Sequence, residues 1–158
     1  MDAAQTLLDI EQIKQLKHRY FRCVDTKDWD GLTDCFVPEA TATYPRHPCA
    51  NRDDILAFLT RLMVPEMVTM HQGHHPEIAV EGDTATGVWH LHDKVIVPAF
   101  DYSLEGAAIY RDRYVRTEDG WKLSHTEYDR LFETSWKLSA IEGYTVNQGE
   151  ISKGTASA

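Results

Sequence analysis

The sequence predicts an α+β fold, a cone-shaped α+β barrel in which N-terminal helices pack into a strongly curved antiparallel sheet. Helical periodicity of apolar residues is confined to the first part of the chain, and long alternating runs follow between residues 68 and 132. Two junctions between these runs, Glu81-Gly82-Asp83 and Glu118-Asp119-Gly120, are acidic-glycine turns typical of hairpins. A meander of hairpins that curls around helices would close a conical cavity between the two layers.

The first helix is expected over about residues 3–24, because apolar side chains recur there at intervals of three and four while polar ones fill the other side. Its tip is Asp25. The expected buried stripe consists of Leu7, Ile10, Ile13, Leu16, Tyr20 and Val24. Residues 26–28 break this pattern, and a short second helix is expected from Trp29 through Phe36, ending before Pro38.

A third helix should begin after Asn51, whose side chain can cap it, and should end at Pro65. Its expected apolar stripe is Ile55, Phe58, Leu59 and Leu62. A short β-prone segment, residues 41–44, precedes it. The long strands are expected over residues 68–80, 84–97, 102–116 and 121–132.

The chain of 158 residues is expected to form one domain over residues 1–140, followed by a partly disordered C-terminal tail over residues 141–158. It carries 25 acidic and 16 basic residues, and the basic ones are scattered, so neither nucleic acid nor an anionic membrane is an expected partner. The cysteines lack metal or redox spacing, and the N-terminus lacks a signal-peptide pattern, which together favour a cytoplasmic protein.

Three segments resemble the nuclear transport factor 2-like superfamily, and within it the SnoaL-like branch that includes scytalone dehydratase, bile acid 7α-dehydratase and hexachlorocyclohexane dehydrochlorinase. These segments are residues 20–32, residues 70–78, and residues 110–114 followed by residues 119–123. The resemblance implies a lyase (dehydratase) or isomerase that uses no cofactor and acts on a hydrophobic polyketide-, steroid- or terpenoid-like molecule. It also implies a homo-oligomer, either a dimer or a trimer. A polyketide cyclase and a non-catalytic ligand-binding or assembly module remain alternatives.

The same resemblance assigns catalysis to Asp25, His71 and Tyr20. Histidine suits proton abstraction next to a carbonyl because its unperturbed pKa lies near neutral pH, and a bonded aspartate would fix its tautomer. Tyr20 would donate a hydrogen bond to a substrate oxygen. Structural roles compete with each assignment, since Asp25 could cap a helix, and both His71 and Tyr20 could be core residues.

The expected substrate-binding residues lie on several predicted elements. They are Tyr44, Phe58, Met67, His74, Trp89, Asp93 and Tyr110, with Met63 and Tyr128 as further apolar lining. The resemblance places Trp89, Leu91 and Asp93 toward the cavity. His90 and His92 would then lie on the outer sheet face, which relatives use for dimerisation.

No metal is expected, although five histidines lie on two predicted strands. His71 and His75 share one face of their strand and His74 takes the other, so a three-ligand site would need a bulge near Gly73. The dehydrochlorinase members also use an arginine on the last strand. This chain is expected to carry Thr126 there, which argues against elimination of halide.

Overall fold

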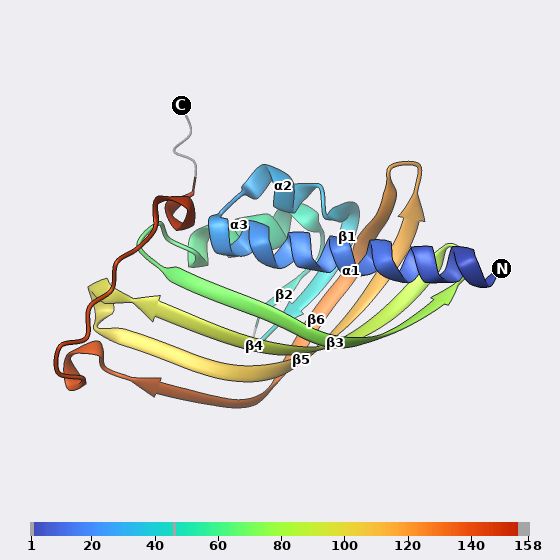
Figure 1. Ribbon diagram of the computed structural model, residues 1–158. Coiled ribbons are helices and arrows are strands. Elements are labelled where there is room, and N and C mark those ends of the chain that lie inside the picture. Colours follow the sequence, from blue (N-terminus) through green and yellow to red (C-terminus); the bar gives the residue numbers. More distant parts are fainter. Residues whose placement is uncertain (1, 46, 155–158) are drawn as a thin grey trace.

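The computed structural model describes residues 2–45 and 47–154 of the chain (Figure 1). Its α-helices are α1 (Ala3–Thr26), α2 (Trp29–Thr33) and α3 (Arg52–Leu62). Its strands are β1 (Phe36–Tyr44), β2 (His47–Cys49), β3 (Val68–Glu81), β4 (Thr84–Val97), β5 (Tyr102–Thr117) and β6 (Gly120–Trp136). A short 3-10 turn, Pro98–Phe100, lies between β4 and β5, and two more, Leu138–Ala140 and Glu150–Lys153, follow β6. The predicted α+β class, with helices ahead of a strand meander, is confirmed.

The strands form one six-stranded sheet in the order β2-β1-β6-β5-β4-β3. Strands β3 to β6 pair antiparallel through the predicted hairpins. The sheet is nevertheless mixed rather than wholly antiparallel, because β1 runs parallel to β6, with Thr41 opposite His125. This pairing brings the first strand of the chain beside the last, so the sheet joins parts of the chain that are far apart in sequence.

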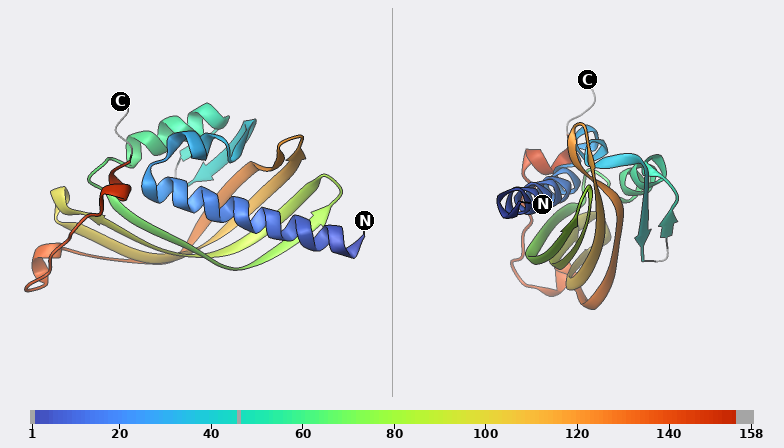
Figure 2. Two further views of the ribbon diagram at one scale, coloured as in Figure 1. Left: turned by 45° about the horizontal axis from the view of Figure 1, so that its top comes forward. Right: turned by 90° about the vertical axis from the view of Figure 1, so that its right-hand side faces the viewer.

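Helix α1 runs along one face of the sheet, and its closest strand is β3 (Figures 1 and 2). It buries Ile13, Leu16, Tyr20 and Val24 as the periodicity predicts. Leu7, which was expected in the same stripe, is instead 69% exposed. The buried face of α1 begins only at Asp9, so Leu7 lies before the part of the helix that packs on the sheet. The helix ends at Thr26, and the capping residue Lys27 adopts a left-handed conformation (φ 54°) that turns the chain toward α2.

The second helix is shorter than the sequence predicts, since it ends at Thr33 and Phe36 already belongs to β1. The backbone amide of Leu123 on β6 donates to the carbonyl of Cys35 (2.8 Å), which draws this segment into the sheet. Pro38 is tolerated within β1 because the β1–β6 register is irregular between Phe36 and Thr41, so no ladder bond requires its missing N–H.

The described part of the C-terminal segment lies against the end of α1 and the start of β3 (Figure 1). The Gln148 side chain donates to the carbonyl of Pro65 (2.7 Å), and the Lys27 ammonium donates to the carbonyls of Ser152 and Met67. Residues 155–158, part of the predicted disordered tail, lie outside the described residues. None of the helices over residues 2–45 and 47–154 has the length and apolar character needed to cross a membrane.

Candidate functional site

Asp25 and His71 meet where the last turn of α1 faces the first half of β3. The Nδ1 atom of His71 lies 2.6 Å from Oδ1 of Asp25, and the His71 backbone amide donates to Oδ2 (2.9 Å). The Thr69 hydroxyl also donates to Oδ1 (2.8 Å). Since Nδ1–H donates to the carboxylate in this geometry, Nε2 is the ring nitrogen left for a substrate.

An aromatic ring from α1 packs parallel to the imidazole of His71. The ring of Phe21 is stacked on that of His71, with an interplanar angle of 4° and centroids 6.0 Å apart. Gly73 makes room for this ring, because a Cβ atom at that position would come within 2.6 Å of Cε2 of Phe21. Gly73, two residues after His71 on β3, therefore leaves the space that the Phe21 ring needs to pack on the imidazole.

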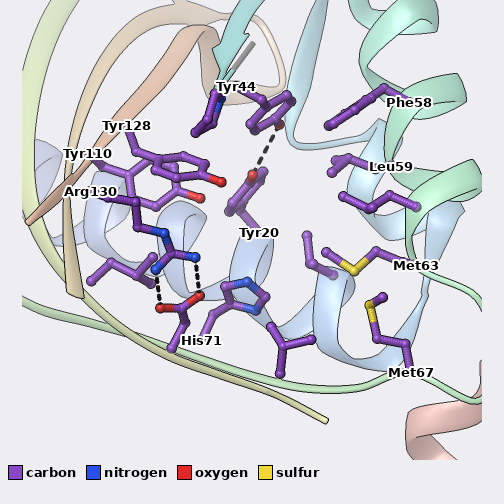
Figure 3. Close-up of a pocket in the computed structure, with 16 residues that line it drawn as sticks. Tyr20, Tyr44, Phe58, Leu59, Met63, Met67, His71, Tyr110, Tyr128 and Arg130 are labelled. Atoms are coloured by element: carbon purple, nitrogen blue, oxygen red, sulfur yellow. Dashed lines mark hydrogen bonds and ion pairs between the residues drawn. The ribbon is translucent and has the colours of Figure 1, made fainter. Parts of the chain in front are cut away.

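A cavity of about 360 Å³ lies between the helices and the sheet, and His71 opens into it (Figure 3). This volume is at the lower end of the range for small-molecule sites. The walls are mostly apolar. They consist of Tyr20, Val24, Tyr44, Pro45, Phe58, Leu59, Leu62, Met63, Met67, His71, Leu91, Asp93, Val95, Tyr110, Tyr128 and Arg130.

Tyrosine hydroxyls gather on one side of this cavity. The hydroxyls of Tyr20 and Tyr44 lie 3.2 Å apart, and Figure 3 shows those of Tyr110 and Tyr128 turned toward the same space. Burial raises the pKa of Tyr20, Tyr44 and Tyr110 well above the ordinary value of 10.0. These phenols are therefore protonated at neutral pH. In the bonded pair of Tyr20 and Tyr44 one hydroxyl donates to the other, so the accepting hydroxyl keeps its own O–H for an oxygen of a bound molecule.

Arg130, which the sequence reasoning missed, enters the same cavity from β6. Its guanidinium binds Asp93 on β4 through two contacts, of 2.5 Å and 2.8 Å. Gly106 on the intervening strand β5 permits this contact, because a Cβ atom there would lie 3.0 Å from Nη1 of Arg130. Burial of Asp93 is thus compensated by a bidentate partner.

This arrangement corrects the expectation about the last strand. Thr126 does not reach the cavity, since it is fully buried and its hydroxyl donates to Asp112 (2.7 Å). An arginine is present on the last strand after all, four residues further on. Strict alternation from Tyr128, together with the need of an inward-facing Asp93 for a cation, was the sequence signal that could have identified it.

The structure brings most of the predicted residues to the cavity but not all of them. Tyr20, Tyr44, Phe58, Met67, His71, Asp93 and Tyr110 line it. Trp89 does not, because its indole N–H donates to Tyr114 (3.0 Å) within the core. His74 does not either, since it is exposed on an outer groove. Asp25 lies behind His71 and faces this same groove.

The remaining histidines lie away from the cavity. A bulge does interrupt β3, but between His74 and Glu77 rather than at Gly73, and His75 has a φ of 28° there. Leu91 and Asp93 are buried on the inner face as expected, while His90 is exposed and His92 contacts Glu105 (2.9 Å). Within the described residues, no group of three or more His, Cys, Asp or Glu is placed to hold a metal ion.

Comparisons with known proteins agree on this fold. A family model described as a SnoaL-like domain matches residues 5–127. The hexachlorocyclohexane dehydrochlorinase LinA-type3 from Novosphingobium barchaimii is 17% identical, with a TM-score of 0.79 over 94% of this chain and 100% of that one. A candidate scytalone dehydratase from Novosphingobium aromaticivorans is 18% identical, with a TM-score of 0.78 over 92% of this chain and 94% of that one. At such identities the likeness shows the fold alone.

Proposed function

The chain belongs to the SnoaL-like domain family, and we propose that it is a cofactor-independent lyase or isomerase in which His71 acts as a base. The substrate is a compact, largely apolar molecule with a carbonyl group. The observation that carries this proposal is the 2.6 Å contact between His71 and Asp25 at the wall of a cavity. Such a pair provides a base with a fixed tautomer.

The reaction starts with transfer of a proton from the carbon next to the carbonyl to Nε2 of His71. Asp25 stabilises the imidazolium that results, because its carboxylate remains bound to the other nitrogen. Transfer of that proton to a hydroxyl on the neighbouring carbon releases water and leaves a carbon–carbon double bond. Transfer to a different carbon instead moves a double bond and gives isomerisation.

The tyrosines supply the second requirement, which is stabilisation of the negative charge that develops on the carbonyl oxygen. Tyr20 and Tyr44 are protonated and lie together on the wall that Tyr110 extends. Donors placed around a developing oxyanion are commonly among the largest contributions to catalysis. Hydrogen bonds from these phenols would therefore orient the carbonyl with its neighbouring carbon toward His71.

The charges of the cavity favour a neutral substrate over an anionic one. Among the described residues of the wall the one arginine is Arg130, and it already binds both oxygens of Asp93. A substrate carboxylate would have to compete with this buried carboxylate for the guanidinium. An uncharged ketone only needs the phenol donors, and the methionine and phenylalanine wall then contacts its carbon skeleton.

A non-catalytic assembly module is less well supported, because such a module has no need of an open cavity or of a histidine in its wall that is bonded to an aspartate. Elimination of halide is a second candidate, supported by the presence of Arg130 on the last strand next to the cavity. Chloride release from a chlorinated cyclohexane would support it. A cyclase would use the same base, and product analysis separates carbon–carbon bond formation from loss of water.

The test uses cyclic β-hydroxy ketones and β,γ-unsaturated ketones whose binding is first established by NMR line broadening. In deuterium oxide the protein should introduce deuterium next to the carbonyl and form the dehydrated or isomerised product. His71→Ala should abolish both, whereas His90→Ala, a change on the outer sheet face, should leave them intact. Exchange that persists in His71→Ala, or no exchange with any bound ketone, would contradict the proposal.

A further inference from the structure

A lysine is fully buried beneath the cavity. Lys17 on α1 has no exposed side-chain surface, and its Nζ lies 2.8 Å from Oδ2 of Asp112 on β5. Asp112 also accepts hydrogen bonds from the hydroxyls of Tyr114 (2.7 Å) and Thr126 (2.7 Å). Hydrogen bonds from β5 and β6 thus fix the carboxylate of Asp112, which in turn forms the ion pair with the ammonium of Lys17.

The ammonium of Lys17 lies over three aromatic rings. It is 3.7 Å from the ring centroid of Tyr110, 4.5 Å from that of Tyr20 and 4.9 Å from that of Phe21. Tyr20 and Tyr110 line the cavity, and Phe21 stacks on His71. One buried charge is therefore in contact with two tyrosines that line the cavity and with the phenylalanine that packs on the proposed base.

Stability alone does not account for this charge. Burial lowers the pKa of Lys17, because desolvation disfavours the ammonium, and the contact with Asp112 is the largest effect that opposes this lowering. A buried ion pair is often no more stable than apolar residues of the same volume. The position between α1 and β5 could hold a methionine and a leucine, so the placement of a cation against cavity-lining rings requires another reason.

We propose that Lys17 is a positioning residue whose charge strengthens the hydrogen bonds that Tyr20 and Tyr110 donate into the cavity, a role that rests on the proposed function. A phenol oxygen gains negative charge as it donates to an oxyanion. A cation at the face of the ring stabilises that charge through the π system. The lysine thereby acts on the substrate oxygen through the phenols and does not touch the substrate.

The test replaces Tyr110 by a difluorotyrosine, whose phenol ionises at lower pH than that of tyrosine. Fluorine NMR then follows its ionisation against pH in the otherwise unchanged protein and in Lys17→Met. Loss of the cation should raise the midpoint by about one pH unit, a tenfold change in the ionisation constant. No substrate is needed, so this result is independent of whether the proposed reaction occurs.

Two further proteins make the result specific. The first is Lys17→Met combined with Asp112→Asn, in which no unpaired carboxylate remains, so that it can be used if Lys17→Met alone does not fold. The midpoint at Tyr110 should still rise in this double variant, but by less than in Lys17→Met. The same probe at Tyr128, which lines the cavity but does not contact Lys17, should move much less. A midpoint at Tyr110 that is unchanged or lower in the double variant, or an equal change at Tyr128, would overturn the proposal.

Discussion

The carboxylate of Asp25 binds His71 twice, once at the backbone amide and once at the imidazole. The first contact fixes the position of β3 against the end of α1, and the second fixes the rotation of the ring. A helix cap would require only backbone partners of a following helix. The following helix is instead capped by Asp28, which accepts from the amide of Gly31 (2.9 Å).

Asp25→Asn should lower turnover of any substrate found for the protein by about 10²–10⁴-fold. The amide retains one acceptor oxygen but cannot accept from all three donors, and it no longer stabilises an imidazolium. Steady-state kinetics beside a thermal unfolding curve would separate this effect from a loss of fold. Full activity in a folded Asp25→Asn protein would remove the aspartate from the mechanism.

Gly73→Ala should displace Phe21 and disturb the stacked imidazole. The added methyl group would meet the Phe21 ring at 2.6 Å, so we expect a loss of about 1–3 kcal/mol in the free energy of unfolding. Gly149→Ala is the matched control, because among the described residues no atom beyond its chain neighbours lies within 4 Å of its Cβ position, and its φ of −70° suits alanine. Urea denaturation of the two variants measures the difference. Equal stabilities would refute the packing role of Gly73.

Arg130→Met should be strongly destabilising, by about 3–5 kcal/mol, because it leaves the buried Asp93 without its cation. Arg130→Met combined with Asp93→Asn should recover part of that loss, since no uncompensated charge remains. Arg111→Met provides the comparison on the same sheet: its pair with Asp129 is exposed, and the expected cost is at most about 1 kcal/mol. Chemical denaturation measures the free energy of unfolding of each variant. A loss for Arg130→Met as small as that for Arg111→Met would contradict this role of Arg130.

The stability of the protein in acid should depend on Asp9. Two contacts of 2.7 Å from Arg116 lower the pKa of Asp9 from 3.8 to about 2. Because the folded pKa lies below the unfolded one, the stabilisation is complete above pH 3.8 and is lost as the pH falls toward 2. The difference in unfolding free energy between the unchanged protein and Asp9→Asn should shrink over this interval. A difference that is constant from pH 5 to pH 2 would rule out this linkage.

The strands of the meander were predictable because their signals are local. The acidic-glycine turns and the alternation between them place β3 to β6 within a few residues of their observed ends. β1 was not predictable in the same way. Its first residues, including Phe36, follow a helical pattern, and they join the sheet only because β6 lies beside them.

The site shows the same division. Asp25 and His71, the pair that the resemblance indicates, are in contact, and Asp93 is buried on the inner face that the resemblance, rather than alternation, favours. Arg130 was missed, although alternation from Tyr128 together with an inward-facing Asp93 points to it. The exclusion of Trp89 from the cavity was not predictable, because it depends on the contact with Tyr114 across the sheet.

The parallel pairing of β1 with β6 also determines when the cavity can exist. Tyr20 and Tyr44 come early in the chain, whereas Tyr128 and Arg130 belong to the last strand. On the ribosome, the helices and β1 emerge first, without the strand that completes their wall. A ligand therefore has no finished cavity to enter until residues 120–136 have been synthesised, and it can stabilise only the complete domain rather than assist the folding of its first half.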